Sequence, residues 1–149
     1  MNLYDELVGV VRALDTARVD YALVGGLAVG LWGAPRATKD IDLLVRPEDL
    51  LSAKEAVRGC GYVPEALPMR FSDGMEMQRL SKIVAGQLTT VDLLLVNANL
   101  ESAWQSRERH ELEDASVSVI SRQALIAMKL SAGRPLDQHD VIKLTEQDR

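Results

Sequence analysis

Two aspartates, Asp40 and Asp42, stand one residue apart at the start of an apolar run over residues 41–45. Successive side chains of a strand point to opposite faces, so both carboxylates project to one face, roughly 6–7 Å apart. A second apolar run, over residues 91–96, also begins with an aspartate, Asp92. Three carboxylates that meet at one end of a sheet repel one another and raise each other's pKa, and a bound cation removes that repulsion. The spacing therefore indicates a cation site, although aspartates at strand starts also serve as turn or cap residues.

The residue types favour Mg²⁺ as the cation. Mg²⁺ takes oxygen ligands, commonly one or two carboxylates, and fills its other positions with water and substrate phosphates. Zinc fits poorly, because the chain has only His110, His139 and Cys60 as nitrogen or sulfur ligands and no zinc-site spacing among them. Both histidines are expected at the surface, and Trp32 and Trp104 are expected to pack rather than to stack on bases.

A Gly25-Gly26 pair closes the apolar run that precedes the aspartates. Glycines between a strand and a helix allow positive φ and close backbone approach, and the exposed amides of such a turn attract phosphate. The alternative is a tight strand–helix turn without a ligand. Neither a P-loop nor a G-x-G-x-x-G dinucleotide motif is present.

The elements that position these residues follow from periodicity and breakers. Residues 62–87 contain two prolines, an Asp-Gly turn and an Ala-Gly-Gln turn, and predict short strands and hairpins. The remaining pattern predicts helices at 3–17, 27–31, 47–58, 100–109, 122–132 and 137–146, and strands at 21–24, 41–45, 91–96 and 116–120, with Ser121 as a helix cap. This order predicts one α/β domain over residues 1–149, with a mixed central sheet flanked by helices.

Bulk composition agrees with a globular chain of this kind. The chain of 149 residues is 47% hydrophobic and 26% charged, which suits one hydrophobic core. The formal net charge of -5 argues against a broad electrostatic contact with nucleic acid. One cysteine, no signal-peptide pattern and no apolar run of membrane-spanning length predict a cytoplasmic protein without a membrane contact.

The segment VGGLAVGLWGAPRATKDIDLLV (24–45) resembles the signature of the DNA polymerase beta nucleotidyltransferase superfamily. The most similar branch comprises small bacterial proteins related to AbiEii toxins, whose Arg-x-Thr-x-Asp-x-Asp motif is matched by Arg36, Thr38, Asp40 and Asp42. The segment MKLSAGRPLDQHDVIKL (128–144) is similar to the C-terminal segment of that branch. Together the matching parts span about residues 20–45, 90–96 and 125–144.

The resemblance implies transfer of a nucleoside monophosphate from a nucleoside triphosphate (NTP) to an acceptor hydroxyl on RNA or tRNA, a protein or a small molecule. It implies two Mg²⁺ ions held by Asp40, Asp42 and Asp92, with Gly25 and Gly26 on the β- and γ-phosphates. Additional candidates for the nucleotide are Thr38, Lys129 and Arg134, and the alternative for the two basic residues is a solvated helix end. Arg36 and Lys39 either contact phosphate or neutralise the aspartates. Asp137 and Asp140, two spaced aspartates of the matching C-terminal segment, are expected to form a helix cap and an ion pair with Arg134.

Two features depart from the resemblance. Many relatives carry a large additional helical part, and many have serine where this chain has Gly26. The resemblance therefore leaves open a second function, a catalytically silent module that binds a nucleotide or a partner. It also implies a possible separately encoded helical or antitoxin partner. A sugar transferase with an Asp-x-Asp metal site is disfavoured, because the chain is too short for that fold and Asp92 would have no role.

Overall fold

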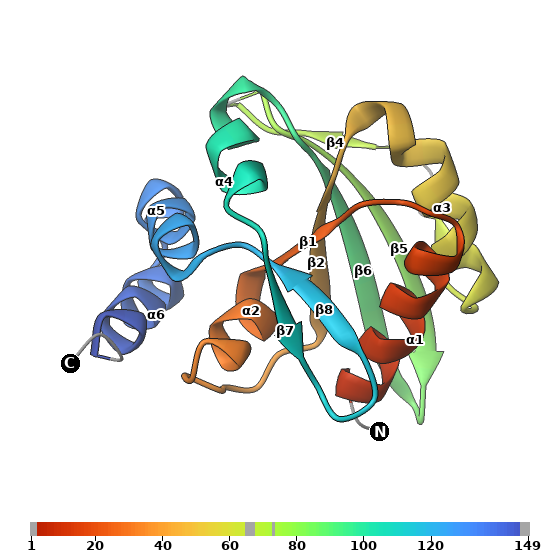
Figure 1. Cartoon of the computed structure of the whole chain (residues 1–149), viewed down its shortest axis with the longest axis horizontal. Helices are drawn as coiled ribbons and strands as arrows, with labels where there is room; N and C mark the ends of the chain where they lie inside the picture. The colour runs from red at the N-terminus through yellow and green to blue at the C-terminus, as the bar shows by residue number, and fades with distance from the viewer. Residues whose placement is uncertain (1–2, 65–67, 73, 147–149) are drawn as a thin grey trace.

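The two runs that begin with aspartates become neighbouring strands at the centre of one mixed sheet (Figure 1). The computed structural model describes residues 3–64, 68–72 and 74–146. The strands run in the order β3-β5-β6-β2-β1-β8-β7, and β4 pairs with β5. Their bounds are β1 Ala22–Val24, β2 Asp40–Val45, β3 Val63–Pro64, β4 Met69–Arg70, β5 Glu76–Val84, β6 Gln87–Leu95, β7 Glu108–Glu111 and β8 Ser116–Val119.

Strand β2 pairs with β6 in parallel and with β1 antiparallel, and β1 pairs with β8 in parallel. This confirms the predicted mixed sheet and makes β2 an internal strand. Ile41, Leu43, Leu44 and Val45 are fully buried. Because both faces of β2 are covered beyond its first residues, its carboxylates can lie only at the end of the strand.

Helices lie on both sides of the sheet in Figure 1. Helices α1 and α3 contact each other and α3 contacts β6, while α2 packs against β1 and β2 and contacts α5. The α5–α6 pair forms the C-terminal part of the described chain. Their bounds are α1 Leu3–Thr16, α2 Gly25–Leu31, α3 Leu50–Gly59, α4 Glu101–Gln105, α5 Arg122–Ala132 and α6 Pro135–Glu146, with short 3-10 helices at Pro47–Asp49 and Ala98–Leu100.

Helix α1 illustrates how periodicity sets the core. Leu7, Val10, Val11 and Leu14 fall at helical spacing and are all fully buried. Burying such a side chain stabilises the fold by about 1.5–3 kcal/mol relative to leaving it exposed. Helix α5 begins as predicted, since the Ser121 hydroxyl accepts a hydrogen bond from the Ala124 amide at 3.1 Å.

In the middle of the chain, the strands are longer than the short strands predicted from the sequence. Residues 76–84 form one continuous nine-residue strand, β5, which turns at Ala85 and Gly86 into an equally long β6. Strand β6 therefore begins four residues before the predicted residue 91, because pairing with β5 extends it into a polar stretch that periodicity alone would not assign to a strand. The predicted Asp-Gly turn includes Asp73, which lies outside the described residues.

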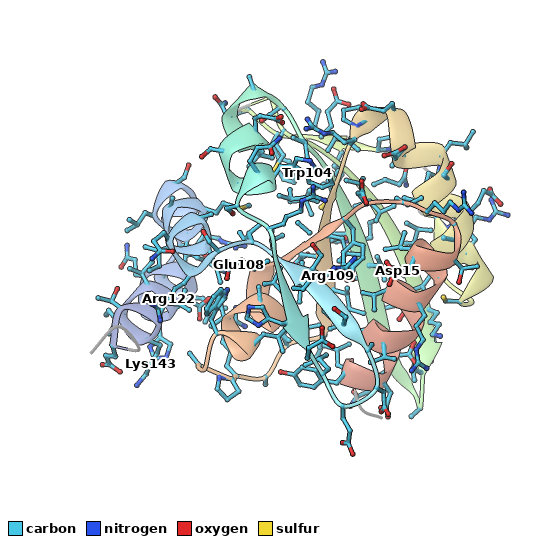
Figure 2. The ribbon with its side chains drawn as sticks, viewed as in Figure 1. Asp15, Trp104, Glu108, Arg109, Arg122 and Lys143 are labelled. Carbon is cyan, nitrogen blue, oxygen red and sulfur yellow. The ribbon has the colours of Figure 1, made fainter. Side chains whose placement is uncertain are left out.

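The predicted helix over 100–109 is wrong in its second half. Helix α4 ends at Gln105, and residues 108–111 form β7, which pairs antiparallel with β8. The polar sequence of 108–111 carries no strand periodicity, and only the partner strand reveals it. Trp104, which belongs to α4, is buried, as expected of a packing residue (Figure 2). No helix among the described residues has the length and apolar character needed to cross a membrane.

Candidate active site

Asp42 and Asp92 lie directly beside each other on the parallel strands β2 and β6. Asp40 takes the same position relative to Thr90, two residues earlier on each strand. Neighbouring strands are about 4.8 Å apart, and register partners point to the same face. The fold therefore brings the three predicted carboxylates together, although Asp92 is fifty residues away from Asp42 along the chain.

Asp40 stands at the first residue of β2 and is held by two threonines. The Thr90 hydroxyl donates a hydrogen bond to Asp40 Oδ1 at 2.6 Å. The Asp40 amide donates to Thr38 Oγ1 at 3.4 Å, which ties the start of the strand to the preceding loop. Thr38, predicted to contact the nucleotide, thus has a structural contact with the first aspartate.

Asp42 carries the clearest electrostatic sign of a charged ligand site. Burial raises the pKa of the Asp42 carboxyl to about 7, and the negative charges of Asp92 and Asp40 act in the same direction. The positive charge of Lys129 opposes the shift. Such crowding of carboxylates is unfavourable without a cation, so the site is poised to bind one.

Arg79 is a site residue that the sequence did not predict. It lies on β5 directly opposite Asp92, and its Nε and Nη2 donate to Asp92 Oδ1 and Oδ2 at 2.8 and 3.0 Å. Asp92 is only 4% exposed. The signal that could have found Arg79 is a long strand β5 aligned with β6 through the Ala85-Gly86 turn, which the sequence pattern did not show.

Gly25 is required by the close approach of Asp42. It has φ of +72°, and a Cβ placed on it would lie 2.2 Å from Asp42 Oδ2. Any side chain at residue 25 would therefore displace the second aspartate. A Cβ on Gly26 would meet Thr38 Oγ1 at 3.0 Å and Arg36 Nη2 at 3.2 Å. The glycine pair thus lies against both parts of the Arg-x-Thr-x-Asp-x-Asp segment.

The remaining basic candidates belong to a C-terminal ion cluster, which consists of Arg36, Lys129, Arg134, Asp137 and Asp140. Arg36 donates to both oxygens of Asp140, at 2.9 and 3.0 Å. Lys129 pairs with Asp137 at 3.3 Å and with Asp140 at 3.2 Å. Arg134 pairs with Asp137 at 2.6 Å. Both aspartates are buried, so the cluster joins α5 and α6 to the loop before β2.

The contacts within this cluster distinguish between the alternative roles that the sequence left open for its residues. Arg36 neutralises Asp140 rather than Asp40 or Asp42. Asp137 does pair with Arg134 and accepts its backbone amide at 3.2 Å, as the cap alternative requires. Burial opposes ionisation of Asp137, yet its hydrogen bond with Arg134 and the charge of Lys129 hold the pKa of its carboxyl below the ordinary value. Lys129 is buried, which contradicts a solvated helix end.

The donor set fits a hard divalent cation at Asp40 and Asp42. Among the described residues, no basic side chain forms an ion pair with either carboxylate. In the same part of the chain, no three His, Cys, Asp or Glu side chains converge closely enough to hold a metal ion as they now stand. Mg²⁺ commonly uses one or two carboxylates together with substrate phosphates, so this pair suffices.

A cavity of about 290 Å³ lies beside the glycine turn. Its lining combines Gly26, Arg36 and Thr38 with side chains of α1 and α2, including Tyr4 and Leu27. Three of the residues predicted to contact the nucleotide therefore share one concave surface, although none of the three aspartates lines it.

Comparison with known proteins identifies the fold. No protein-family model matches the chain, and no curated protein matches it in sequence. Among solved structures, the lincosamide antibiotic adenylyltransferase LnuA bound to lincomycin has a TM-score of 0.66 at 15% identity, over 95% of each chain. A nucleotidyltransferase candidate from Thermotoga maritima, TM1012, has a TM-score of 0.68 at 15% identity, over 99% of this chain and 94% of its own.

A third structure is ANT(2")-Ia in complex with adenylyl-2"-tobramycin. It has a TM-score of 0.66 at 15% identity, over 97% of this chain and 88% of its own. The chain thus has a nucleotidyltransferase fold along nearly its whole length, which confirms the fold expected from the resemblance.

Proposed function

We propose that the chain is a Mg²⁺-dependent nucleotidyltransferase that moves a nucleoside monophosphate from an NTP to an acceptor hydroxyl. The observation that carries this proposal is the meeting of Asp40, Asp42 and Asp92 on two adjacent parallel strands, against a Gly25-Gly26 turn. The nucleotidyltransferase fold supports it, because that fold is what places the three carboxylates together. Cytoplasmic location, expected from the sequence, suits an enzyme that consumes NTP.

The triphosphate would lie against the glycine turn. The first amides of α2 have no partner within the helix, and the absence of side chains at Gly25 and Gly26 lets phosphate oxygens approach them closely. Lys129 supplies positive charge near Asp42, as its effect on the Asp42 pKa shows. Contacts of Lys129, Arg134, Arg36 and Thr38 with the nucleotide remain predictions, since in this structure the three basic residues are paired with Asp137 and Asp140.

Asp40 and Asp42 would hold Mg²⁺ together with phosphate oxygens. When bound, the ion neutralises the charge that develops on the triphosphate as the α-phosphate is attacked. A second ion, predicted from the sequence, would have to share Asp92 with the guanidinium of Arg79, which contacts both carboxylate oxygens.

Asp92 would receive the acceptor, because it lies beside Asp42 on the adjacent parallel strand. Its carboxylate would accept the hydrogen bond, and then the proton, of the acceptor hydroxyl. That hydroxyl oxygen forms a new bond to the α-phosphorus, the bond between the α- and β-phosphates breaks, and pyrophosphate leaves with its electron pair.

For the acceptor we favour a small hydroxylated molecule. LnuA is described as an antibiotic adenylyltransferase, and the ANT(2")-Ia structure holds an adenylylated tobramycin. The chain covers 95% and 88% of those two chains, so the shared part is almost the whole of each. The net charge of -5 is in keeping with a small acceptor rather than a long RNA. A toxin–antitoxin role and a separately encoded partner stay predictions from the sequence.

The test is incubation of the purified chain with each α-labelled NTP, Mg²⁺ and a lysate, followed by separation of RNA, protein and small molecules. We expect label in the small-molecule fraction with the wild type and none with Asp42→Ala. Asp20→Ala, at an exposed aspartate, is the matched control and should label normally. Label on RNA or protein would show that the acceptor is not a small molecule, and would leave the proposed nucleotidyl transfer unchanged.

Absence of label under all conditions would contradict the enzymatic proposal. If Mg²⁺ and an NTP still raised the melting temperature in that case, the alternative of a nucleotide-binding module would replace it.

A further inference from the structure

The three carboxylates of the site are not equivalent. Arg79 engages both oxygens of Asp92 in a two-pronged contact, at 2.8 and 3.0 Å, across the register pair of β5 and β6. Asp40 receives one hydroxyl hydrogen bond from Thr90, and no ion pair to Asp40 or Asp42 exists among the described residues. One carboxylate therefore already has a cation, and two do not.

The contact between Arg79 and Asp92 is built into the sheet. The two residues are direct cross-strand partners in the middle of two nine-residue strands, so their backbones cannot separate without opening the ladder. A planar guanidinium matches a carboxylate with two parallel hydrogen bonds, which makes this the strongest common form of ion pair. Asp92 is only 4% exposed, so little water competes for these hydrogen bonds.

The charges of the site point the same way. Arg79 already supplies a positive charge to both oxygens of Asp92. A second cation on Asp92 would face the guanidinium at close range, and like charges at close range repel.

We propose that Arg79 takes the place of a second metal ion, so that the site holds one divalent cation, at Asp40 and Asp42. Asp92 stays paired with Arg79 beside that cation. A carboxylate has about four lone-pair positions, so the two that Arg79 leaves free can accept the hydrogen bond of the acceptor hydroxyl. Arg79 is thus a positioning residue, which fixes the orientation of Asp92. This inference rests on the proposed function, since it concerns the metal of that site.

The test counts Mn²⁺ on the full chain, alone and with the α,β-methylene analogue of the NTP that stabilises the chain most. Equilibrium dialysis with Mn²⁺ yields the number of bound ions, and a sample with nucleotide but no protein serves as the reference. Electron paramagnetic resonance separates an isolated Mn²⁺ from a spin-coupled pair. We expect one isolated Mn²⁺ on the wild type. We expect a second, coupled ion on Arg79→Leu, because Asp92 is then without a cation.

Two control variants separate charge from position. Arg79→Lys keeps the positive charge and should hold one ion, as the wild type does. Arg70→Leu removes the arginine of an exposed pair with Glu76 on the neighbouring β4–β5 ladder, and should also leave the count at one.

The outcomes are distinct for the two proposals. A coupled pair of ions on the wild type would overturn the role of Arg79 while leaving the proposed function intact. The same holds if Arg79→Leu folds, by circular dichroism, and still binds one ion. If Arg79→Leu fails to fold, the counts on the wild type and Arg79→Lys decide. No Mn²⁺ on the wild type would contradict the metal site of the proposed function, and this inference with it.

Discussion

At the scale of single residues, the site depends on how closely Gly25 and Asp42 approach each other. The glycine adopts a left-handed conformation and lies where any β-carbon would collide with the carboxylate. The carboxylate in turn is crowded by Asp92 and Asp40. Gly25 is therefore constrained by sterics and Asp42 by electrostatics. Each constraint predicts the effect of a different experiment.

Gly25→Ala should reduce activity by about 100-fold, because a displacement of about 1 Å at a reacting site costs that much. The variant should also lose more than about 1 kcal/mol of unfolding free energy, since alanine is strained at positive φ. Steady-state kinetics and urea denaturation measure the two effects. Gly9→Ala, in α1 where nothing lies within 4 Å of the added carbon, should instead stabilise the chain by about 0.5–1 kcal/mol. Equal activity of the two variants would contradict the steric argument.

The raised pKa of Asp42 predicts a pH-dependent stability of the metal-free chain. The ordinary pKa of 3.8 rises to about 7 on folding, so between these values the folded chain keeps a proton that the unfolded chain releases. The contribution of Asp42 to the unfolding free energy therefore falls as the pH rises from about 4 to 7, by a few kcal/mol at most.

Urea denaturation of the wild type and Asp42→Asn at pH 5 and pH 8, with a chelator present, measures this contribution. The wild type should lose stability relative to Asp42→Asn at pH 8, and Mg²⁺ should restore part of it by favouring the charged carboxylate. A difference between the two proteins that stays constant with pH would show that Asp42 is not crowded in the folded chain.

At the scale of elements, the C-terminal ion cluster attaches the α5–α6 pair to the loop before β2. Asp140 of α6 receives Arg36 from that loop and Lys129 from α5. Asp140 and Lys129 are buried, and the Arg36 side chain is 23% exposed. The same loop leads into Asp40, so the docking of α6 and the position of the first aspartate are mechanically connected.

Asp140→Ala should destabilise the chain by about 3–5 kcal/mol, the typical cost of removing one partner from a buried ion pair. The reason is that Arg36 and Lys129 would lose their common counter-charge while Lys129 stays buried. Thermal or urea unfolding measures the loss. Glu146→Ala on the same helix removes an exposed pair with Lys143 at 3.8 Å, near the end of α6 in Figure 2, and should change stability by less than about 0.5 kcal/mol. Similar losses for both variants would mean that the cluster does not hold α6.

At the scale of the whole molecule, binding should stabilise the fold by mass action. In the proposed site, Mg²⁺ and NTP would bind residues of β2 and the start of α2 beside Asp92 of β6, so the complex would require the assembled sheet. The site is thus linked to global unfolding rather than to the opening of one segment.

With NTP at about 100 times its dissociation constant and Mg²⁺ present, the unfolding free energy should rise by about 2.7 kcal/mol. Each kcal/mol corresponds to a melting shift of about 2–4 °C for a chain of this size. Differential scanning fluorimetry with each NTP, with and without chelator, measures the shift. Asp42→Asn should lose the Mg²⁺-dependent part, and Asp20→Asn should keep it. A shift that survives the chelator unchanged would separate nucleotide binding from the metal site.

Local sequence determined the parts of this protein that depend on local physics. Hydrophobic spacing predicted α1 and its buried face, and the apolar runs predicted β2 and the central part of β6. The two Asp-led runs and the glycine pair predicted a common site, because a carboxylate beside core residues needs a partner. Ser121 predicted the start of α5 through its capping hydroxyl.

The tertiary structure decided everything that depends on which strands and side chains become neighbours. Strand pairing extended β5 and β6 and turned residues 108–111 into β7, since backbone hydrogen bonds to a partner outweigh a weak local pattern. The strand register brought Arg79 into an ion pair with Asp92, and the packing of α6 brought Asp140 into an ion pair with Arg36. The residues that neighbour a side chain in sequence indicate whether it is buried. Which oppositely charged residue becomes its partner depends on contacts between distant segments, and only the folded chain defines these contacts.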